Sequence, residues 1–127
     1  MNPIAAEYVD KAEGDFATAQ REVAATVNPN YDAVCFHAQQ CAEKYLKARL
    51  QESGIMFGKT HDLTLLLNLA LTVEPAWNAF LTDLQALSAF AVAYRYPGDS
   101  ADLGDAQDAV SKCGSFRSAA RASLSLP

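Results

Sequence analysis

Four polar side chains share one edge of the stretch FHAQQCAEKYLKARL when it is drawn as a helix. At 3.6 residues per turn the four fall within an arc of about 80°, and they are His37, Gln40, Lys44 and Lys47. An imidazole can accept or donate a proton near neutral pH, and ammonium groups can bind an anion such as phosphate. The same edge also fits an ordinary solvated face, because Glu43 and Lys47 form a favourable i, i+4 ion pair. Both interpretations remain open from this stretch alone.

A second candidate lies in KTHDL, residues 59–63, which leads into a leucine-rich segment. Free backbone N–H groups at the start of a helix favour anions, so Lys59, His61 and Asp62 could contact a phosphate there. The structural alternative is equally compatible with the pattern, because either Thr60 or Asp62 would serve as an ordinary N-cap.

A third candidate lies in YRYPGD, residues 94–99, where Arg95 stands between Tyr94 and Tyr96 just before a proline. Because proline prevents the helix from continuing, the arginine falls in a last helical turn. A cation there complements the helix dipole, and a guanidinium beside aromatic rings is also suited to holding a base or a phosphate. The sequence does not choose between these roles.

The overall composition narrows the function classes. The chain has 127 residues, half of them hydrophobic, and a net charge of −5. This length suits one domain, residues 1–127, and the negative charge argues against tight, non-specific binding to nucleic acid. No set of side chains has metal-ligand spacing, and common catalytic signatures are absent, so we expect no metal and no cofactor. We find no signal peptide and no membrane-spanning stretch, and we interpret the three cysteines as reduced thiols of a cytoplasmic protein: Cys35, Cys41 and Cys113.

Proline and glycine divide the chain into five segments with helical periodicity, and none shows the alternation of a strand. The sequence therefore predicts an all-α protein, an antiparallel up-and-down bundle of about five helices. Asn2 and Asn30 are the expected N-caps of the first two segments, and six leucines between 62 and 72 predict that the third helix is buried. The expected segments are 2 to about 27, 30–53, about 62–72, about 75–94 and about 102–124.

The three candidate stretches together resemble the HEPN domains, named for higher eukaryotes and prokaryotes nucleotide-binding, and in particular their small stand-alone prokaryotic members. The similarity rests on AxxFHAQQxxEKYLKA at 33–48, on THDL at 60–63 and on RYPG at 95–98. The opening stretch EYVDKAEGDFATA also fits the first helix of that family. The resemblance covers most of the chain.

This resemblance implies a helical bundle that usually forms a homodimer and acts beside a minimal nucleotidyltransferase in a two-component, toxin–antitoxin-like pair. Many members are metal-independent endoribonucleases with an arginine followed shortly by a histidine. Here Arg95 is the arginine that aligns, but His37 and His61 both precede it. His61 and Arg95 are therefore catalytic candidates only if the fold brings them together.

Three functions follow as hypotheses from these residues. The chain binds a nucleotide or an RNA phosphate; it is a ribonuclease; or it is a structural subunit that holds a nucleotidyltransferase through its apolar surface. The binding hypothesis predicts that the three stretches meet at one concave site. The expected ligand-binding residues are His37, Gln40, Lys44, Lys47, Lys59, His61, Asp62, Arg95 and Tyr96.

Overall fold

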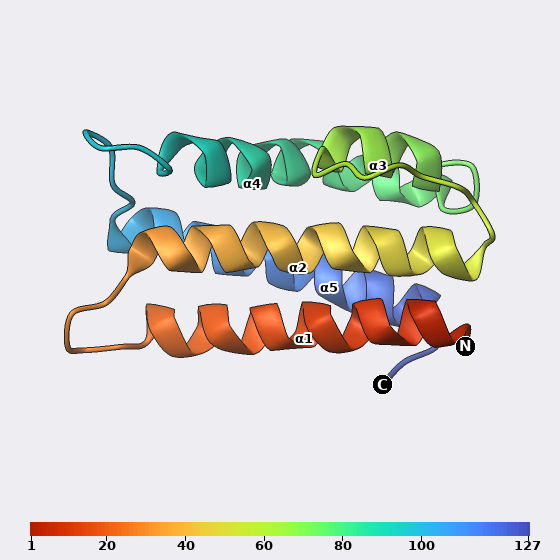
Figure 1. The fold of residues 1–127 in the computed structure, drawn as a ribbon, viewed down its shortest axis with the longest axis horizontal. Coiled ribbons are helices and arrows are strands. Elements are labelled where there is room, and N and C mark those ends of the chain that lie inside the picture. Colours follow the sequence, from red (N-terminus) through yellow and green to blue (C-terminus); the bar gives the residue numbers. More distant parts are fainter.

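The computed structural model describes all residues from 1 to 127 and contains helices and no strands, so the predicted all-α bundle is confirmed. Helices α1, α2, α4 and α5 alternate in direction, and both chain termini lie at the same end of the bundle (Figure 1). None of the helices combines the length and the apolar character that crossing a membrane requires. The elements are α1 (Pro3–Val23), α2 (Tyr31–Glu52), α3 (Leu63–Ala70), a 3₁₀ turn η1 (Pro75–Phe80), α4 (Leu81–Ala93) and α5 (Leu103–Ser123).

Helix α2 lies at the centre of the bundle and contacts each of the other four α-helices. Its apolar side packs as the sequence predicts, because Val34, Ala38, Cys41, Tyr45 and Ala48 are fully buried. Its polar edge is also covered: Glu43 is 2% exposed and Lys47 is 8% exposed. The interpretation of this edge as an ordinary solvated face is therefore wrong.

The cover over this edge comes from the connection between α2 and α3. After Glu52 the chain turns back along the bundle, so α3 begins near the middle of α2 and runs parallel to it (Figure 1). The turn is made by Gly54, whose φ of +68° lies in the left-handed region that favours glycine. The returning segment lies over the part of α2 that carries Lys47, whose ammonium lies 6.0 Å from the centre of the Phe57 ring.

Polar caps fix the starts of the helices. The side chain of Asn2 accepts from the N–H groups of Ile4 and Ala5, and Asn30 accepts from Ala33 N–H, as expected. Asp62 caps α3, because its side chain accepts from the N–H groups of Thr64 and Leu65. Of the two N-cap candidates in the sequence, Thr60 and Asp62, the cap is therefore Asp62. At α5, Asp102 and Asp105 form a reciprocal capping box.

Two helical segments differ from the sequence expectation. The fourth begins as the 3₁₀ turn Pro75–Phe80 and becomes α-helical only at Leu81. The third is shorter than predicted, and it is not buried on all sides, because Leu65 is 45% exposed. Since α3 lies at the surface of the bundle, only the side with Leu63, Leu66 and Leu67 can be fully covered.

All three cysteines are free and buried. Burial raises the pKa of the Cys35 thiol to about 11. A hydrogen bond with Cys113, together with burial, raises the pKa of Cys41 well above its usual range. Because the thiolate is the reactive form, Cys35 and Cys41 act as core residues.

A charged cluster ties α1 to α2 and α5. Both oxygens of the Glu13 carboxylate accept from the Arg117 guanidinium at 2.6 Å, and Tyr45 O–H donates to the same carboxylate at 2.5 Å. Arg121 in turn donates to the Tyr45 hydroxyl at 2.9 Å. The bidentate bond from Arg117 is the main reason that the pKa of Glu13 falls from 4.5 to about 2. This cluster is strongest while Glu13 is ionised.

We predict that this cluster makes the fold acid-sensitive. The pKa of Glu13 is lower in the folded chain, so the unfolded chain binds the extra proton and the stabilisation is lost as the pH falls through the range from about 5 to about 2. Urea unfolding at a series of pH values should show that Glu13→Gln is less stable than wild type at neutral pH and approaches it in acid. The matched control is Asp10→Asn, an exposed residue of the same helix. If the difference in free energy of unfolding between Glu13→Gln and wild type does not change with pH, ionisation of Glu13 does not stabilise the fold.

Candidate functional site

Three of the predicted binding residues meet at one surface pocket. Lys47 comes from α2, and Lys59 and His61 come from the connection that returns over it. The pocket has a volume of about 440 Å³, and its remaining lining residues are Tyr8, Phe57 and Gly58. Two of the three candidate stretches are thus brought together by the fold.

The buried carboxylate of Glu43 organises this pocket from beneath. Lys47 Nζ donates to Glu43 Oε2 at 3.2 Å, and His61 Nδ1 lies 3.1 Å from both carboxylate oxygens. Gln39 Nε2 donates to Glu43 Oε1 and to the His61 carbonyl oxygen, each at 3.3 Å. A buried charge needs such partners, because an unpaired one costs several kcal/mol. Glu43 therefore fixes both the lysine and the histidine.

The two sides of the pocket differ in exposure. The Lys47 side chain is largely covered, whereas the His61 side chain is 76% exposed. Because His61 Nδ1 points to Glu43, its Nε2 has no partner within the chain. Lys59 is exposed and makes no ion pair. Lys47 therefore forms the floor, and Lys59 and His61 form the rim.

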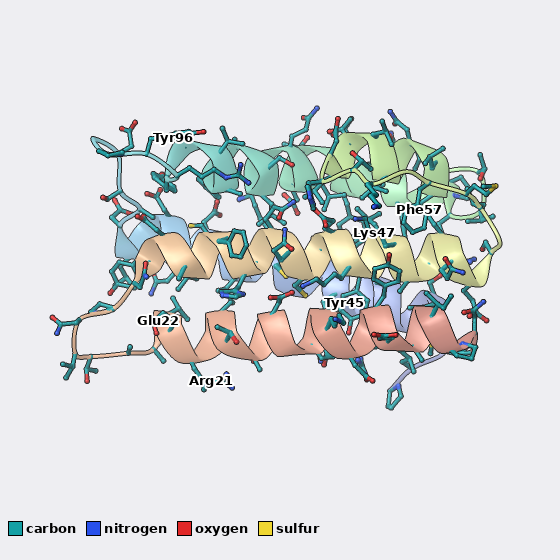
Figure 2. All side chains as sticks on the ribbon, viewed as in Figure 1. Arg21, Glu22, Tyr45, Lys47, Phe57 and Tyr96 are labelled. Carbon is teal, nitrogen blue, oxygen red and sulfur yellow. The ribbon has the colours of Figure 1, made fainter.

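Aromatic rings complete the pocket. The Lys47 ammonium lies 6.0 Å from the centre of the Phe57 ring, and the rings of Phe57 and Tyr8 are 6.3 Å apart. Figure 2 shows Lys47 and Phe57 close together over α2. Cationic groups beside half-buried aromatic rings suit a ligand that carries both negative charge and a flat ring.

His37 and Lys44 lie on the same edge of α2 but bind elsewhere. His37 Nδ1 lies 2.7 Å from Asp15 Oδ1, and Lys44 Nζ lies 2.5 Å from Asp15 Oδ2. These contacts join α2 to α1, outside the pocket. Gln40 Nε2 donates to Gln39 Oε1 at 2.7 Å, so Gln40 supports the glutamine that holds Glu43.

The third stretch lies apart from the pocket. Arg95 and Tyr96 follow α4 and are both exposed, and neither lines the pocket. Figure 2 shows Tyr96 near one end of the bundle, far along its length from Lys47 and Phe57. Asp62 caps α3 and does not line the pocket either. Within one chain, therefore, only two of the three stretches that were predicted to meet lie at the same pocket.

Sequence reasoning missed both aromatic residues of the pocket and the glycine between Phe57 and Lys59. Tyr8 belongs to the apolar stripe of the first helix, which predicts a core residue, and Phe57 lies in the loop IMFGKT without any periodic pattern. The signal in the loop was its composition, because an aromatic residue, a glycine and a lysine follow one another two positions before His61. Burial of Glu43 had no sequence signal, since an i, i+4 Glu–Lys pair is typical of exposed helix faces.

Comparisons with known proteins agree on one family. The model of the HEPN domain matches residues 5–123. An archaeal HEPN homologue of known crystal structure superposes with a TM-score of 0.69 at 24% sequence identity, covering 93% of this chain and 95% of that one. A search of curated proteins gives no match.

We predict that removing the buried carboxylate destabilises the fold more than removing both charges. Glu43→Ala leaves the Lys47 ammonium buried without its partner, and should lower the free energy of unfolding by about 3 kcal/mol. The double variant Glu43→Leu, Lys47→Met should lose clearly less free energy of unfolding than Glu43→Ala, because no unpaired buried charge remains. Urea unfolding at neutral pH measures both.

The matched control is Asp108→Ala, which breaks the other i, i+4 pair, with Lys112, on the outer side of α5. That pair is more exposed, so its loss should cost less than about 1 kcal/mol. Equal losses for Glu43→Ala and Asp108→Ala would contradict the role given to the buried charge.

Proposed function

Because the chain belongs to the HEPN family, we propose that it binds the phosphate groups of a nucleotide or of RNA. The single observation that carries this proposal is the pocket where Lys47, Lys59 and His61 meet beside two aromatic rings. Its volume of about 440 Å³ lies in the range that small-molecule sites usually have.

The electrostatics of the pocket support an anionic ligand. Glu43 neutralises one positive charge, and it is buried below the pocket, whereas the Lys59 ammonium is available at the rim. His61 Nδ1 is engaged by Glu43, so its Nε2 can donate to a phosphate only when the ring is an imidazolium. A phosphate can therefore accept hydrogen bonds at the rim without approaching the carboxylate. Charge-assisted hydrogen bonds of this kind are stronger than neutral ones.

The geometry favours binding over cleavage. Cleavage of RNA by the mechanism that the resemblance implies needs His61 as a base and Arg95 beside the same phosphate. Arg95 lies outside the pocket that His61 lines, so a single chain does not supply both groups to one ligand. For this reason we propose a binding protein rather than a ribonuclease.

We also propose that the chain forms a homodimer and acts with a minimal nucleotidyltransferase in a two-component system. Large apolar side chains are exposed at the end of α4, in the turn that follows it and at the start of α5, namely Val92, Tyr96 and Leu103. Exposed apolar groups of this size commonly mark surfaces that contact another protein. The family membership supports the same assignment.

We predict that a nucleoside triphosphate binds at the pocket rim. Lys59→Gln and His61→Asn should each weaken ATP binding roughly tenfold, because the first removes the exposed ammonium and the second removes the imidazolium that donates from Nε2 while Nδ1 stays on Glu43. Isothermal titration calorimetry measures the affinity. Lys112→Gln, a paired lysine on α5, is the control that should bind as wild type. Wild-type affinity in both rim variants, or loss only in Arg95→Gln, would place the ligand elsewhere.

We predict that a charge on the exposed part of α4 disrupts association. Val92→Glu should shift the sedimentation equilibrium from dimer to monomer, because burying the new carboxylate in an interface is costly. Val27→Glu, at an exposed position in the connection before α2, is the control that should leave the mass unchanged. A wild-type chain that sediments as a monomer would contradict the homodimer. Copurification with a coexpressed nucleotidyltransferase tests the second partner.

A further inference from the structure

His61 presents one ring nitrogen to the pocket and keeps the other on a buried carboxylate. Its Nδ1 lies 3.1 Å from both oxygens of Glu43, and its side chain is 76% exposed. A carboxylate only accepts hydrogen bonds, as Glu43 also does from the Lys47 ammonium at 3.2 Å. In the neutral form of the ring, the proton therefore lies on Nδ1 and the lone pair lies on the exposed Nε2.

A neutral imidazole held in this tautomer is a nucleophile. Histidine is among the side chains that form covalent bonds to reacting groups, and a hydrogen bond to one ring nitrogen decides which nitrogen is free to react. A ring that has reacted at Nε2 gains positive charge. Glu43 compensates this charge through its bond with Nδ1, because hydrogen bonds between ionised groups are strong. The buried carboxylate therefore favours reaction of Nε2 with an electrophile.

The neighbouring cations determine which electrophile fits. Lys47 and Lys59 line the same pocket as His61, which has a volume of about 440 Å³. Ammonium groups beside a phosphoryl group stabilise the charge that its oxygens carry during transfer. A phosphoryl group that binds these lysines therefore shares a pocket with the free nitrogen of His61.

His37 offers an internal comparison. Its Nδ1 lies 2.7 Å from Asp15 Oδ1, so a carboxylate orients this ring in the same way. The Lys44 ammonium binds the other oxygen of Asp15 at 2.5 Å, and the His37 side chain is only 29% exposed. Because His37 does not line the pocket, it has an oriented ring without a phosphate site.

Other nucleophilic side chains of the chain are less reactive. Burial raises the pKa of the Cys35 thiol to about 11. Burial likewise raises the pKa of Tyr45 well above its usual range. Tyr94 O–H donates to Asp105 at 2.9 Å, and this bond raises the pKa of Tyr94 to about 12. Since these groups keep their protons at neutral pH, His61 is the better acceptor.

We propose that His61 Nε2 accepts the γ-phosphoryl group of a nucleoside triphosphate bound at the pocket. This inference rests on the proposed phosphate-binding function and adds a reaction and a means of regulation at the same site. The Nε2 lone pair forms a bond to phosphorus, the bond from phosphorus to the β–γ bridging oxygen breaks, and the nucleoside diphosphate leaves with that electron pair. No proton leaves the ring, because Nδ1 keeps its hydrogen on Glu43. The bound phosphoryl group then occupies the anion site and blocks a further phosphate.

The test incubates the chain with magnesium ATP that carries radioactive phosphorus in the γ position. Wild type and His37→Asn should take up label that acid removes and alkali preserves, as expected for phosphohistidine, and His61→Asn should take up none. Mass spectrometry of peptides kept in alkali should place the phosphoryl group on His61. ATP labelled in the α position should leave no label on the chain. Thermal unfolding checks that His61→Asn is folded.

Glu43→Gln tests the positioning role of the carboxylate. The amide keeps the shape of the side chain but cannot compensate the charged ring, so phosphorylation at saturating ATP should slow roughly tenfold, as after loss of an orienting partner. The ATP concentration that gives half the maximal rate should not rise, because Lys59 still binds phosphate. Asp15→Asn makes the same change beside His37 and should react as wild type.

Failure of this proposal can be told apart from failure of phosphate binding. If calorimetry shows that ATP binds but His61 takes up no acid-labile label, the acceptor role is overturned and the binding function stands. If ATP does not bind, both fail together. Equal labelling of wild type and His61→Asn would place the phosphoryl group elsewhere and overturn the proposal. Label from the α position would indicate transfer of the nucleotide and would also overturn it.

Discussion

A buried carboxylate cannot remain charged without partners, and Glu43 satisfies this constraint with groups from three places in the chain. Lys47 lies one turn along α2, Gln39 lies one turn before, and His61 comes from the returning connection. The carboxylate thereby anchors the connection onto α2. The pocket exists because this anchoring holds Lys59 and Phe57 beside Lys47.

The other charged contacts set the frame in which this anchoring works. Asp15 binds His37 and Lys44, and Glu13 binds Arg117, so α1 is fixed against both α2 and α5. Since Tyr8 lies on the same helix, these contacts also place its ring at the pocket. The polar groups of α2 therefore divide into two sets. One set joins helices, and the other faces the proposed ligand.

The helices were predictable because their signals are local. Periodic apolar residues and the caps Asn2 and Asn30 follow from backbone chemistry at each position. The prediction for the third helix was less accurate. Leucines on all sides of a helix indicate complete burial, whereas α3 lies at the surface with Leu65 exposed. Likewise, no local pattern in the sequence distinguishes the 3₁₀ turn Pro75–Phe80, in which Trp77 is buried against Phe116, from the start of an α-helix.

The site was predictable only in part, because it depends on the path of one connection. Lys47, Lys59 and His61 were recognised as basic groups, but their meeting with Tyr8 and Phe57 follows from the chain turning back at Gly54. Arg95 is separated from these residues because α4 carries the chain along the bundle away from the pocket. No local sequence pattern indicates how far from the pocket α4 ends.

The most direct test of this account is an NMR titration of the wild-type chain with a nucleoside triphosphate. The account predicts that the largest changes occur in the backbone amides of residues 57–61 and in the His61 imidazole, with smaller ones at Tyr8. Changes concentrated at residues 94–98, with the signals of His61 and Lys59 unaltered, would contradict it.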